Sequence, residues 1–305
     1  MKKYLIVVSV LFLFILTACT DKESKEYKPT YSNDAPNSKK VYIFGVHPLH
    51  NPKRLFEVYQ PLVDYINSNL SNAVLKLEAS RNYAAYDEKL FSGYFDFSLP
   101  NPYQTVKSLE HGYKVFGKMG DDKNFRGIIL VRKDSNINKV EDLKGKVVSY
   151  PAPTALAATM MPQWFLYKNG IDINKDIKNN YVGSQESSIM NVYLKKSIAA
   201  ATWPPPWKAF IKERPEVAKE VEIKWETTSL PNNGLVVKDG TPKVLIEKVS
   251  KLLFELHLTK EGRNILSPME LSRFEKANKS RYLPVVEFLK KFENEVRDIR
   301  GKSDE

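Results

Sequence analysis

The sequence predicts an α/β protein whose folded part consists of two lobes, each built on a mostly parallel sheet. Two observations lead to this prediction. Short apolar runs alternate with amphipathic stretches along the chain, a pattern typical of strands that are connected by helices. In addition, about 265 residues remain beyond position 40, more than one compact core usually holds.

The elements follow from hydrophobic periodicity. The predicted strands are short apolar runs bounded by Gly, Pro or polar residues: 40–46, 73–80, 95–100, 126–133, 145–150, 198–202 and 233–238. The predicted helices have apolar residues three and four positions apart, as Leu55, Val58 and Leu62 illustrate. They cover 52–70, 83–93, 154–170, 189–197, 242–266 and 282–299.

The N-terminus has the features of an export signal. Lys2 and Lys3 precede the apolar run 4–17, which is too short for a convincing membrane span, and the run leads into "LTAC". This ending resembles the lipobox of bacterial lipoproteins, which implies a signal peptide over 1–18 and an acylated Cys19. Residues 20–40 contain no Val, Ile, Leu, Met, Phe or Trp, so 19–40 is expected to be a disordered lipid tether.

Cysteine usage and charge exclude several classes of protein. Cys19 is the only cysteine, so the chain forms no intramolecular disulfide and has no thiolate for a metal or a nucleophile once Cys19 is acylated. The formal charge is +11, and it falls to +9 when Lys2 and Lys3 leave with the signal (11 − 2). A basic surface suits an anionic membrane. Nucleic acid is not an expected partner, because the lysines are dispersed and there is no basic-aromatic motif.

Four loops are expected to form a ligand site, because ligands of open α/β sheets bind beyond the carboxyl ends of the strands. They are "HPLHN", "PNPY", "PAPT" and "WPPPW", at 47–51, 100–103, 151–154 and 203–207. Three consecutive prolines predict a stiff, open loop in the last of these. Trp203 is then the preformed apolar wall of a pocket, while Trp207 lies either in the pocket or in the core. The alternative is that both tryptophans pack in the second lobe.

Several segments together resemble one family. They are "FGVHP", "YQPLVDYI", "GYFDFSLPNPY", "VGSQESS", "SRFEKANKSRYLPVVEFL" and, most specifically, "FRGIILVRKDSNINKVEDLKGKVVSY". Residues 41 to about 290 are similar to the phosphate, phosphite and phosphonate branch of the periplasmic solute-binding proteins of ABC importers.

The resemblance implies a type 2 periplasmic binding protein: two α/β lobes joined by two crossing strands, with a ligand cleft between them that closes by hinge motion. The crossings are expected near "ILVRK" and "NGLVV". One lobe then comprises 41–130 plus 235–305, and the other 131–234. The implied partners are a small-molecule ligand, an ABC permease and, through Cys19, a lipid bilayer on its extracytoplasmic face. A monomer is expected.

The departures from the family bear on the ligand. The family's hydroxyl cradle, Ser-Thr-Ser-Gly, corresponds here to Ala155, Leu156, Ala157 and Ala158. The family's His corresponds to Gln185. The Asp that would meet an ammonium group corresponds to Ala199. The resemblance therefore implies weak binding of ordinary phosphonates and favours a ligand with an anionic part near Thr154 and an apolar part along Trp203.

The candidate ligand-binding residues are those of the expected loops and the nearby polar side chains. They are His47, Arg81, Tyr83, Tyr103, Arg126, Thr154, Ala155, Gln185 and Trp203.

The chemistry of three of them is specific. Thr154 is placed to cap a helix whose first N–H groups favour an anion, and Arg81 and Arg126 could supply paired donors. Thr154 has the structural alternative of a cap without a ligand, and the two arginines that of lying on solvated faces. The alternative for the candidate tyrosines is a place in the core. His47 and His50 have a spacing found in some metal sites, but no Cys or carboxylate lies nearby in the sequence. No metal and no cofactor are expected.

Three functions were compared. Capture of a solute for an ABC importer is favoured, and presentation of the ligand to a membrane sensor kinase is the alternative. An enzyme is not expected, because the chain has no Gly-x-Ser-x-Gly, His-Glu-x-x-His or phosphate-binding Gly-rich loop.

Overall fold

The computed structural model describes residues 39–299, which belong to one compact unit. The expected signal peptide, Cys19 and the tether up to residue 38 lie outside the described residues. Within the described part, no helix is both long and apolar enough to cross a membrane.

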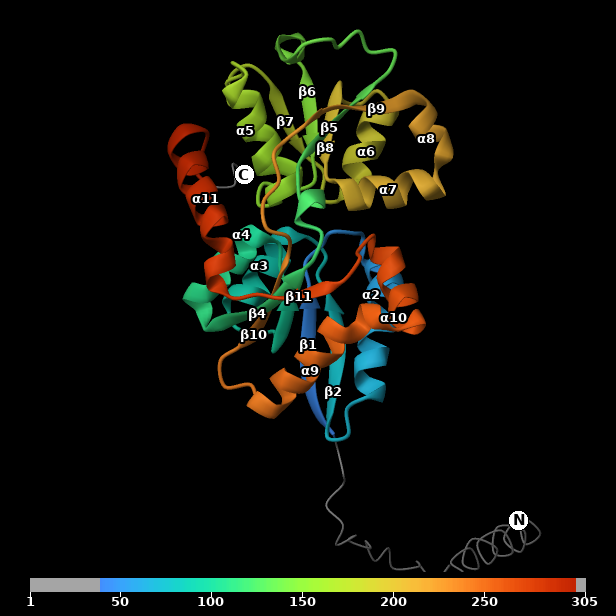
Figure 1. The fold of residues 1–305 in the computed structure, drawn as a ribbon. Coiled ribbons are helices and arrows are strands. Elements are labelled where there is room, and N and C mark those ends of the chain that lie inside the picture. The colour runs from blue at the N-terminus through green and yellow to red at the C-terminus, as the bar shows by residue number, and fades with distance from the viewer. Residues whose placement is uncertain (1–38, 300–305) are drawn as a thin grey trace, which may run out of the picture. The chain divides into compact units, whose positions relative to one another are not determined.

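One half of the unit, formed by N-terminal and C-terminal segments, is built on a six-stranded sheet, here called sheet A, in the order β11-β4-β10-β3-β1-β2 (Figure 1). Its strands are β1 (Lys40–Val46), β2 (Ala73–Ala79), β3 (Phe97–Leu99), β4 (Tyr113–Met119), β10 (Gly234–Lys238) and β11 (Phe274–Lys276). Its helices are α2 (Pro52–Ser68), α3 (Tyr83–Phe91), α4 (Pro102–Ser108), α9 (Lys243–Glu255), α10 (Lys260–Leu266) and α11 (Leu283–Glu295).

The second half is built on a five-stranded sheet, sheet B, in the order β7-β6-β8-β5-β9. Its strands are β5 (Ile128–Arg132), β6 (Val147–Tyr150), β7 (Lys178–Tyr181), β8 (Ala199–Thr202) and β9 (Val221–Glu226). Its helices are α5 (Met161–Lys168), α6 (Gln185–Tyr193), α7 (Pro204–Glu213) and α8 (Pro215–Glu220), and the π-helical turn Leu156–Met160 leads into α5.

The chain crosses twice between the two sheets. The first crossing segment, residues 120–127, joins β4 to β5, and the second, residues 227–233, joins β9 to β10. Each crossing lies just before the strand near which the sequence predicted it. The predicted lobe boundary at 130/131 falls inside β5, so sheet B begins at Ile128.

Both sheets are mixed, and the expectation of mostly parallel sheets is therefore wrong. The pairs β1–β2, β1–β3, β6–β7 and β6–β8 are parallel, whereas β5 and β10 pair antiparallel with both of their neighbours. The reason is topological: β5 and β10 each enter their sheet directly from a crossing segment and not from a helix on the sheet's face.

Two expected loops begin helices instead. "PNPY" contains the N-terminus of α4, where Asn101 and Gln104 form a capping box. "WPPPW" contains the start of α7: Trp203 is the N-cap and Pro204, Pro205 and Pro206 fill the first turn. The stiff-loop prediction is wrong because the N–H groups of a first turn have no partner within the helix, so prolines lose nothing there.

The sequence did not predict four of the strands, and three of these lie at sheet edges. β7, β9 and β11 are edge strands, and the sequence of β7, "KNNY", is polar throughout. β4 lies inside sheet A, but Lys118 interrupts its apolar run. The predicted helix 189–197 is α6, which begins four residues earlier, at Gln185, and the predicted helix 242–266 is the pair α9 and α10.

The C-terminal helix α11 belongs by sequence to the sheet A half but also contacts the sheet B half. Trp164 of α5 packs edge-on against Phe288 of α11, with ring centroids 5.9 Å apart. Arg297, just beyond α11, donates to Gln163 Oε1 at 2.9 Å and to the Pro153 carbonyl at 2.7 Å. The helix therefore connects the two halves independently of the crossing segments.

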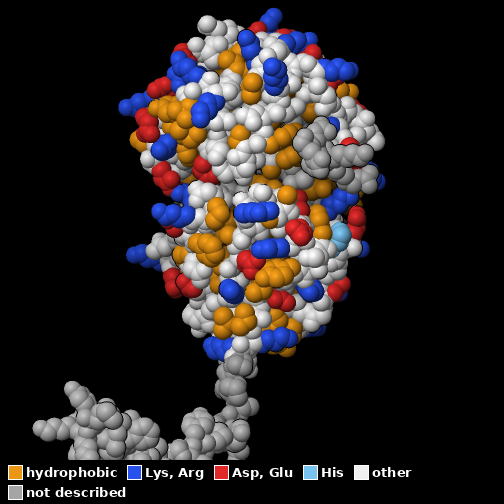
Figure 2. Space-filling model, turned by 180° about the vertical axis from the view of Figure 1, so that it is seen from behind, with side chains coloured by type: hydrophobic (Ala, Val, Ile, Leu, Met, Phe, Trp, Pro, Cys, Tyr) orange, Lys and Arg blue, Asp and Glu red, His pale blue; other side chains and the backbone are white. Residues whose placement is uncertain are grey.

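The surface carries mixed charge. On the face shown in Figure 2, Lys and Arg side chains are dispersed among Asp, Glu and apolar side chains. Many of the charged residues form exposed ion pairs of the kind that contributes little to stability, such as Lys291 with Glu287 at 2.7 Å.

Candidate functional site

A small cavity, with about 10 Å³ of space for the centre of a water molecule, lies where both crossing segments and the ends of several strands meet. Its lining comes from both halves and contains no Lys, Arg, Asp or Glu. The lining residues are His47, Tyr83, Asn101, Phe125, Ala155, Leu156, Ala157, Ala158, Gln185, Trp203 and Asn233. Five of the nine residues predicted from the sequence are among them: His47, Tyr83, Ala155, Gln185 and Trp203.

The wall from the sheet B half is the π-helical turn that leads into α5. The carbonyl of Ala155 accepts from the N–H groups of Thr159 at 2.8 Å and Met160 at 3.2 Å. The N–H groups of Leu156, Ala157 and Ala158 belong to the first turn, where they have no partner within the helix, and N–H groups of this kind favour a nearby anion. None of these three residues has a hydroxyl side chain; Thr159, later in the same turn, has a buried one.

The sequence explains the shape of this turn. Pro162 has no N–H to pair with a carbonyl one turn earlier, which favours the wider π turn. A Cβ on Gly127 would lie only 2.6 Å from the Ala157 carbonyl oxygen, so glycine at this position lets the first crossing segment pass directly against the turn.

Gln185 and Tyr83 meet across the cavity. Gln185 Oε1 accepts from the Thr202 hydroxyl at 2.7 Å, so its Nε2 donates to Tyr83 Oη at 3.4 Å. Burial raises the pKa of Tyr83 well above its usual value. The hydroxyl of Tyr83 is therefore protonated at any physiological pH and can donate to an anionic ligand.

His47 is neutral. Burial lowers its pKa to about 4, although its bond to the Leu99 carbonyl acts in the opposite direction. Nδ1 donates to that carbonyl at 2.8 Å, which leaves Nε2 as a hydrogen-bond acceptor. His47 therefore contributes a lone pair and no positive charge to the cavity lining.

Trp203 forms the apolar wall. Its side chain is buried and its ring lies 5.5 Å from that of Phe125, in the first crossing segment. Trp207 lies instead in the core beneath α6 and α7, with Ile128, Leu130 and Phe210. Trp203 thus lines the cavity, whereas Trp207 packs within the sheet B half.

The structure places the other four predicted residues outside the cavity. Arg81 is exposed just before α3. Arg126 binds Glu226 through Nε at 2.8 Å and Nη2 at 3.2 Å, and its Nη1 donates to the Lys123 carbonyl. Tyr103 and Thr154 line a neighbouring recess, which shares only Tyr83 with the cavity.

Thr154 is not a helix cap. Ala155 occupies the N-cap position, and the Thr154 hydroxyl donates to Asp87 Oδ2 at 3.2 Å. Burial raises the pKa of Asp87 to about 7, against the lowering effect of hydrogen bonds from Gln104 and Thr154. Thr154 therefore helps to join the two halves beside the cavity.

Further contacts close the two halves around the cavity. Asn101 Nδ2 donates to the Thr154 carbonyl at 3.0 Å on one side. On the other side His50 pairs with Glu186 at 3.2 Å, and Arg54 pairs with Glu213. Burial raises the pKa of Glu186, but the contact with His50 outweighs it and the pKa is lowered overall. These contacts join the two halves on both sides of the cavity.

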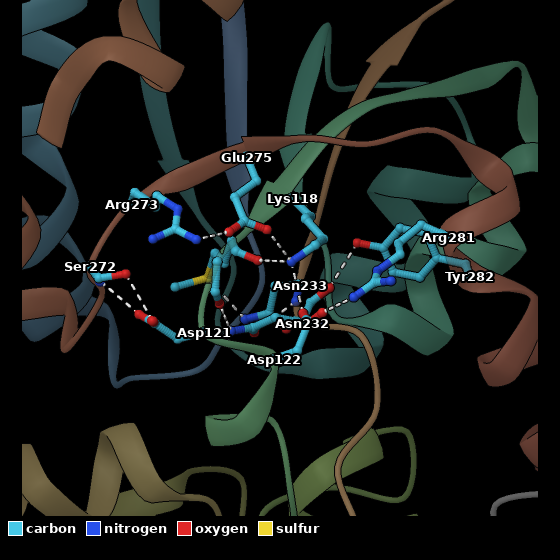
Figure 3. A network of polar contacts seen from close by, with 12 residues as sticks. Lys118, Asp121, Asp122, Asn232, Asn233, Ser272, Arg273, Glu275, Arg281 and Tyr282 are labelled. Atoms are coloured by element: carbon cyan, nitrogen blue, oxygen red, sulfur yellow. Dashed lines mark hydrogen bonds and ion pairs between the residues drawn. The ribbon is translucent and has the colours of Figure 1, made fainter. Parts of the chain in front are cut away.

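The crossing segments are held by a polar network around Lys118, whose side chain is 4% exposed. Figure 3 shows Lys118 reaching between Glu275, at 2.9 Å, and Asp122, at 2.8 Å. Asp122 also binds Arg281 and accepts from the backbone N–H of Asn232 at 2.9 Å. Both crossing segments are therefore anchored to sheet A.

Three polar or aromatic lining residues were not predicted: Asn101, Phe125 and Asn233. Asn101 lies in an expected ligand loop, and the other two lie on the crossing segments. The sequence contained a usable signal, because the crossings of such a fold border its cleft.

The described residues include no group of three or more His, Cys, Asp or Glu side chains that could hold a metal ion.

Two α/β halves that the chain crosses twice, with a small lined cavity at the crossings, define a two-lobed solute-binding protein of the type 2 periplasmic class. The chain belongs to the family described as "ABC transporter, phosphonate, periplasmic substrate-binding protein", whose model matches residues 44–282. Members of this family are, by that description, periplasmic substrate-binding proteins of transporters and not enzymes.

Curated relatives and solved structures agree with this family. The chain is 24% identical over 196 residues to the "Probable ABC transporter phosphite binding protein PhnD1" of Prochlorococcus marinus, covering 60% of this chain and 66% of the relative. It is 22% identical over 192 residues to the "Phosphate-import protein PhnD" of Mycolicibacterium smegmatis, covering 58% of each. The matches thus span less than two thirds of either relative.

The structure of Prochlorococcus PhnD1 in complex with methylphosphonate matches with a TM-score of 0.77 at 20% identity, covering 85% of this chain and all of that one. A binding-protein component of a phosphonate transporter from Pseudomonas aeruginosa matches with a TM-score of 0.76 at 17% identity, covering 82% and 86%. At these identities the two structures support the fold.

Proposed function

We propose that the protein captures a small phosphorus oxyanion, of the size of phosphite or methylphosphonate, and delivers it to an ABC permease. The observation that carries the proposal is the cavity itself, because residues of both halves line it and it offers the N–H groups of a helix start. The names of the relatives, one a phosphite-binding and one a phosphate-import protein, point to the same chemistry.

The lining suits a compact ligand with an anionic head and a small apolar substituent. The free space in this structure is about that of one water molecule, so the two halves would have to separate slightly to admit such a ligand. The N–H groups of the lining and the Tyr83 hydroxyl would bind the oxygens, while Trp203 and Phe125 would contact a hydrogen or methyl group on phosphorus. Hydrogen bonds to a charged group contribute about 1.5–3 kcal/mol each. The absence of hydroxyls at Ala155, Ala157 and Ala158 therefore favours weaker binding than a full hydroxyl cradle would give.

Release is proposed to involve opening of the two halves at the crossing segments. The pairs His50–Glu186 and Asp87–Thr154 would break in that movement, because each joins one half to the other.

Tyr83→Phe is expected to weaken the binding of methylphosphonate about tenfold or more, because it removes one donor to a charged oxygen. Isothermal titration with methylphosphonate, phosphite, phosphate and 2-aminoethylphosphonate would measure this. The aminophosphonate is expected to bind most weakly, since no carboxylate lines the cavity.

Arg126→Gln is the matched control. It removes a guanidinium that binds Glu226 and lies outside the cavity, so affinity is expected to stay unchanged. If none of the four compounds bound, or if Arg126→Gln abolished binding and Tyr83→Phe did not, the proposed site would be wrong.

We also propose that Cys19 is the acylated N-terminus of the mature protein and anchors it to the membrane. The basis is the sequence "LTAC" and the polar segment that follows it. Cys19→Ala is expected to release the protein from the membrane fraction and to abolish labelling by a fatty acid. Continued labelling of the Cys19→Ala protein would refute the assignment.

A further inference from the structure

The two sides of the cavity differ in hydrogen-bonding character. The sheet B half supplies donors: the N–H groups of the turn at Leu156–Ala158 and the amide of Gln185. The other side supplies one donor, the Tyr83 hydroxyl, and also two acceptors. His47 has an unprotonated Nε2, and Asn233 has a buried Oδ1 without a hydrogen-bond partner. Because an unpaired buried carbonyl is unfavourable, its presence at a ligand cavity indicates a donor on the ligand.

The orientation of Asn233 is determined by its neighbours. Its N–H donates to Asn232 Oδ1 at 2.8 Å, and its carbonyl accepts from Met119 N–H at 2.8 Å. Nδ2 donates to Met119 Sδ at 3.3 Å. A thioether sulfur can accept but cannot donate, so turning the amide over would place two acceptors together. Oδ1 is therefore the one polar atom of Asn233 that these contacts leave without a partner.

The residue that holds Asn233 is itself fixed. Asn232 Nδ2 donates to the Gly120 carbonyl at 2.7 Å, and its own carbonyl accepts from Tyr282 Oη at 2.7 Å. Figure 3 shows both asparagines beside Lys118 and Asp122, within the network that anchors the crossing segments. A carbonyl held in this way cannot rotate easily to avoid an anionic oxygen. It therefore favours a ligand that places a hydrogen-bond donor there over one that places an anionic oxygen there.

We propose that Asn233 Oδ1 accepts a hydrogen bond from the ligand, so that the cavity selects an oxyanion in its singly protonated form. This inference rests on the proposed function and adds the protonation state of the ligand. A P–OH group satisfies Oδ1 while the remaining oxygens accept from the helix turn. A fully ionised oxyanion places a negative oxygen against a carbonyl oxygen, and a sulfonate has no proton to offer.

The test compares methylphosphonate with methanesulfonate by isothermal titration of the full-length protein at about pH 6. Both are then mainly monoanions of similar shape, and only the phosphonate carries a hydroxyl. Wild-type protein is expected to bind methylphosphonate on the order of 100-fold more tightly, because sites built to bind a hydroxyl reject analogues without it. Above the second ionisation of methylphosphonate its affinity is expected to fall about tenfold per pH unit.

The pH series needs an internal control because groups of the protein also titrate. His47 lines the cavity, and Asp87 and Glu186 lie beside it on the contacts that close it. Tyr83 also lines it, while Lys118 and Asp122 lie behind Asn233. Methanesulfonate does not change its charge in this range, so any loss that both ligands share comes from the protein. The ratio of the methylphosphonate affinity to the methanesulfonate affinity therefore measures the effect of the proton on methylphosphonate.

Asn233→Leu removes the acceptor at nearly constant size. It is expected to reduce the preference for methylphosphonate over methanesulfonate to within about threefold. Ser272→Ala is the matched control, because Ser272 binds Asp121 in the same network but does not line the cavity. It should keep the full preference. If Asn233→Leu fails to fold, the wild-type ratio and its pH series still decide.

Equal binding of the two ligands by wild-type protein, or methylphosphonate affinity that rises through its second ionisation, would overturn the inference and leave the proposed function intact. Absence of binding by methylphosphonate, phosphite and phosphate at every pH would overturn the proposed function itself, and the inference with it.

Discussion

Trp203→Ala is expected to lower the free energy of unfolding by about 3–5 kcal/mol, the usual effect of truncating a buried aromatic side chain. Trp203 is 3% exposed and packs against Phe125. The substitution also enlarges the cavity, so methylphosphonate should bind more weakly and bulkier phosphonates should be admitted. Urea denaturation and titration measure the two effects.

Trp207→Ala separates the two effects. Trp207 is 6% exposed and packs in the sheet B core, away from the cavity. Its truncation should destabilise the fold by a similar amount while leaving the affinity of the folded protein unchanged. An equal loss of affinity in both variants would show that the change at Trp203 acts through general loosening and not as a pocket wall.

Lys118→Met is expected to destabilise the protein by about 3 kcal/mol, because it leaves two carboxylates without their buried partner. The value lies at the lower end of the usual range because Asp122 and Glu275 are 25% and 29% exposed. Thermal or urea unfolding measures the loss. Adding Asp122→Asn and Glu275→Gln should restore part of it, since no carboxylate then lacks its buried partner, while the half-exposed Arg281 and Arg273 lose theirs.

Lys114→Met provides the control on the same strand. Lys114 pairs with Asp239 at 2.8 Å, but the two side chains are 76% and 51% exposed. Its loss should change stability by less than about 1 kcal/mol. A similar loss in both variants would mean that burial of Lys118 has no special role.

Sequence patterns predicted the interior of the fold well and its edges poorly. Strands with continuous apolar runs, such as β1 and β8, stand out, whereas β7 and β9 border solvent and mix polar with apolar residues. The three prolines of α7 led to the prediction of a loop, because proline breaks a helix in its interior. In the first turn of a helix proline is tolerated.

The candidate site was predictable where it follows from strand ends and not where it depends on tertiary pairing. His47 and Trp203 directly follow strands, so their position in the cavity could be expected. Arg126 was equally plausible from the sequence, but Glu226, a hundred residues away, binds its guanidinium. Asn233 could be expected in the lining from its place on a crossing segment, but its particular role could not, because that role comes from one unpaired atom.

The C-terminal helix makes the two sides of the molecule mechanically unequal. On one side α11 and Arg297 tie the sheet A half to α5 and to Pro153. Among the described residues, the other side is joined by contacts such as the ion pair Arg54–Glu213, between α2 and α7 (Figure 1). A rotation that kept the α11 contacts intact would separate the two halves mainly on the side of α2 and α7. A ligand is therefore expected to enter and leave along the α2–α7 margin.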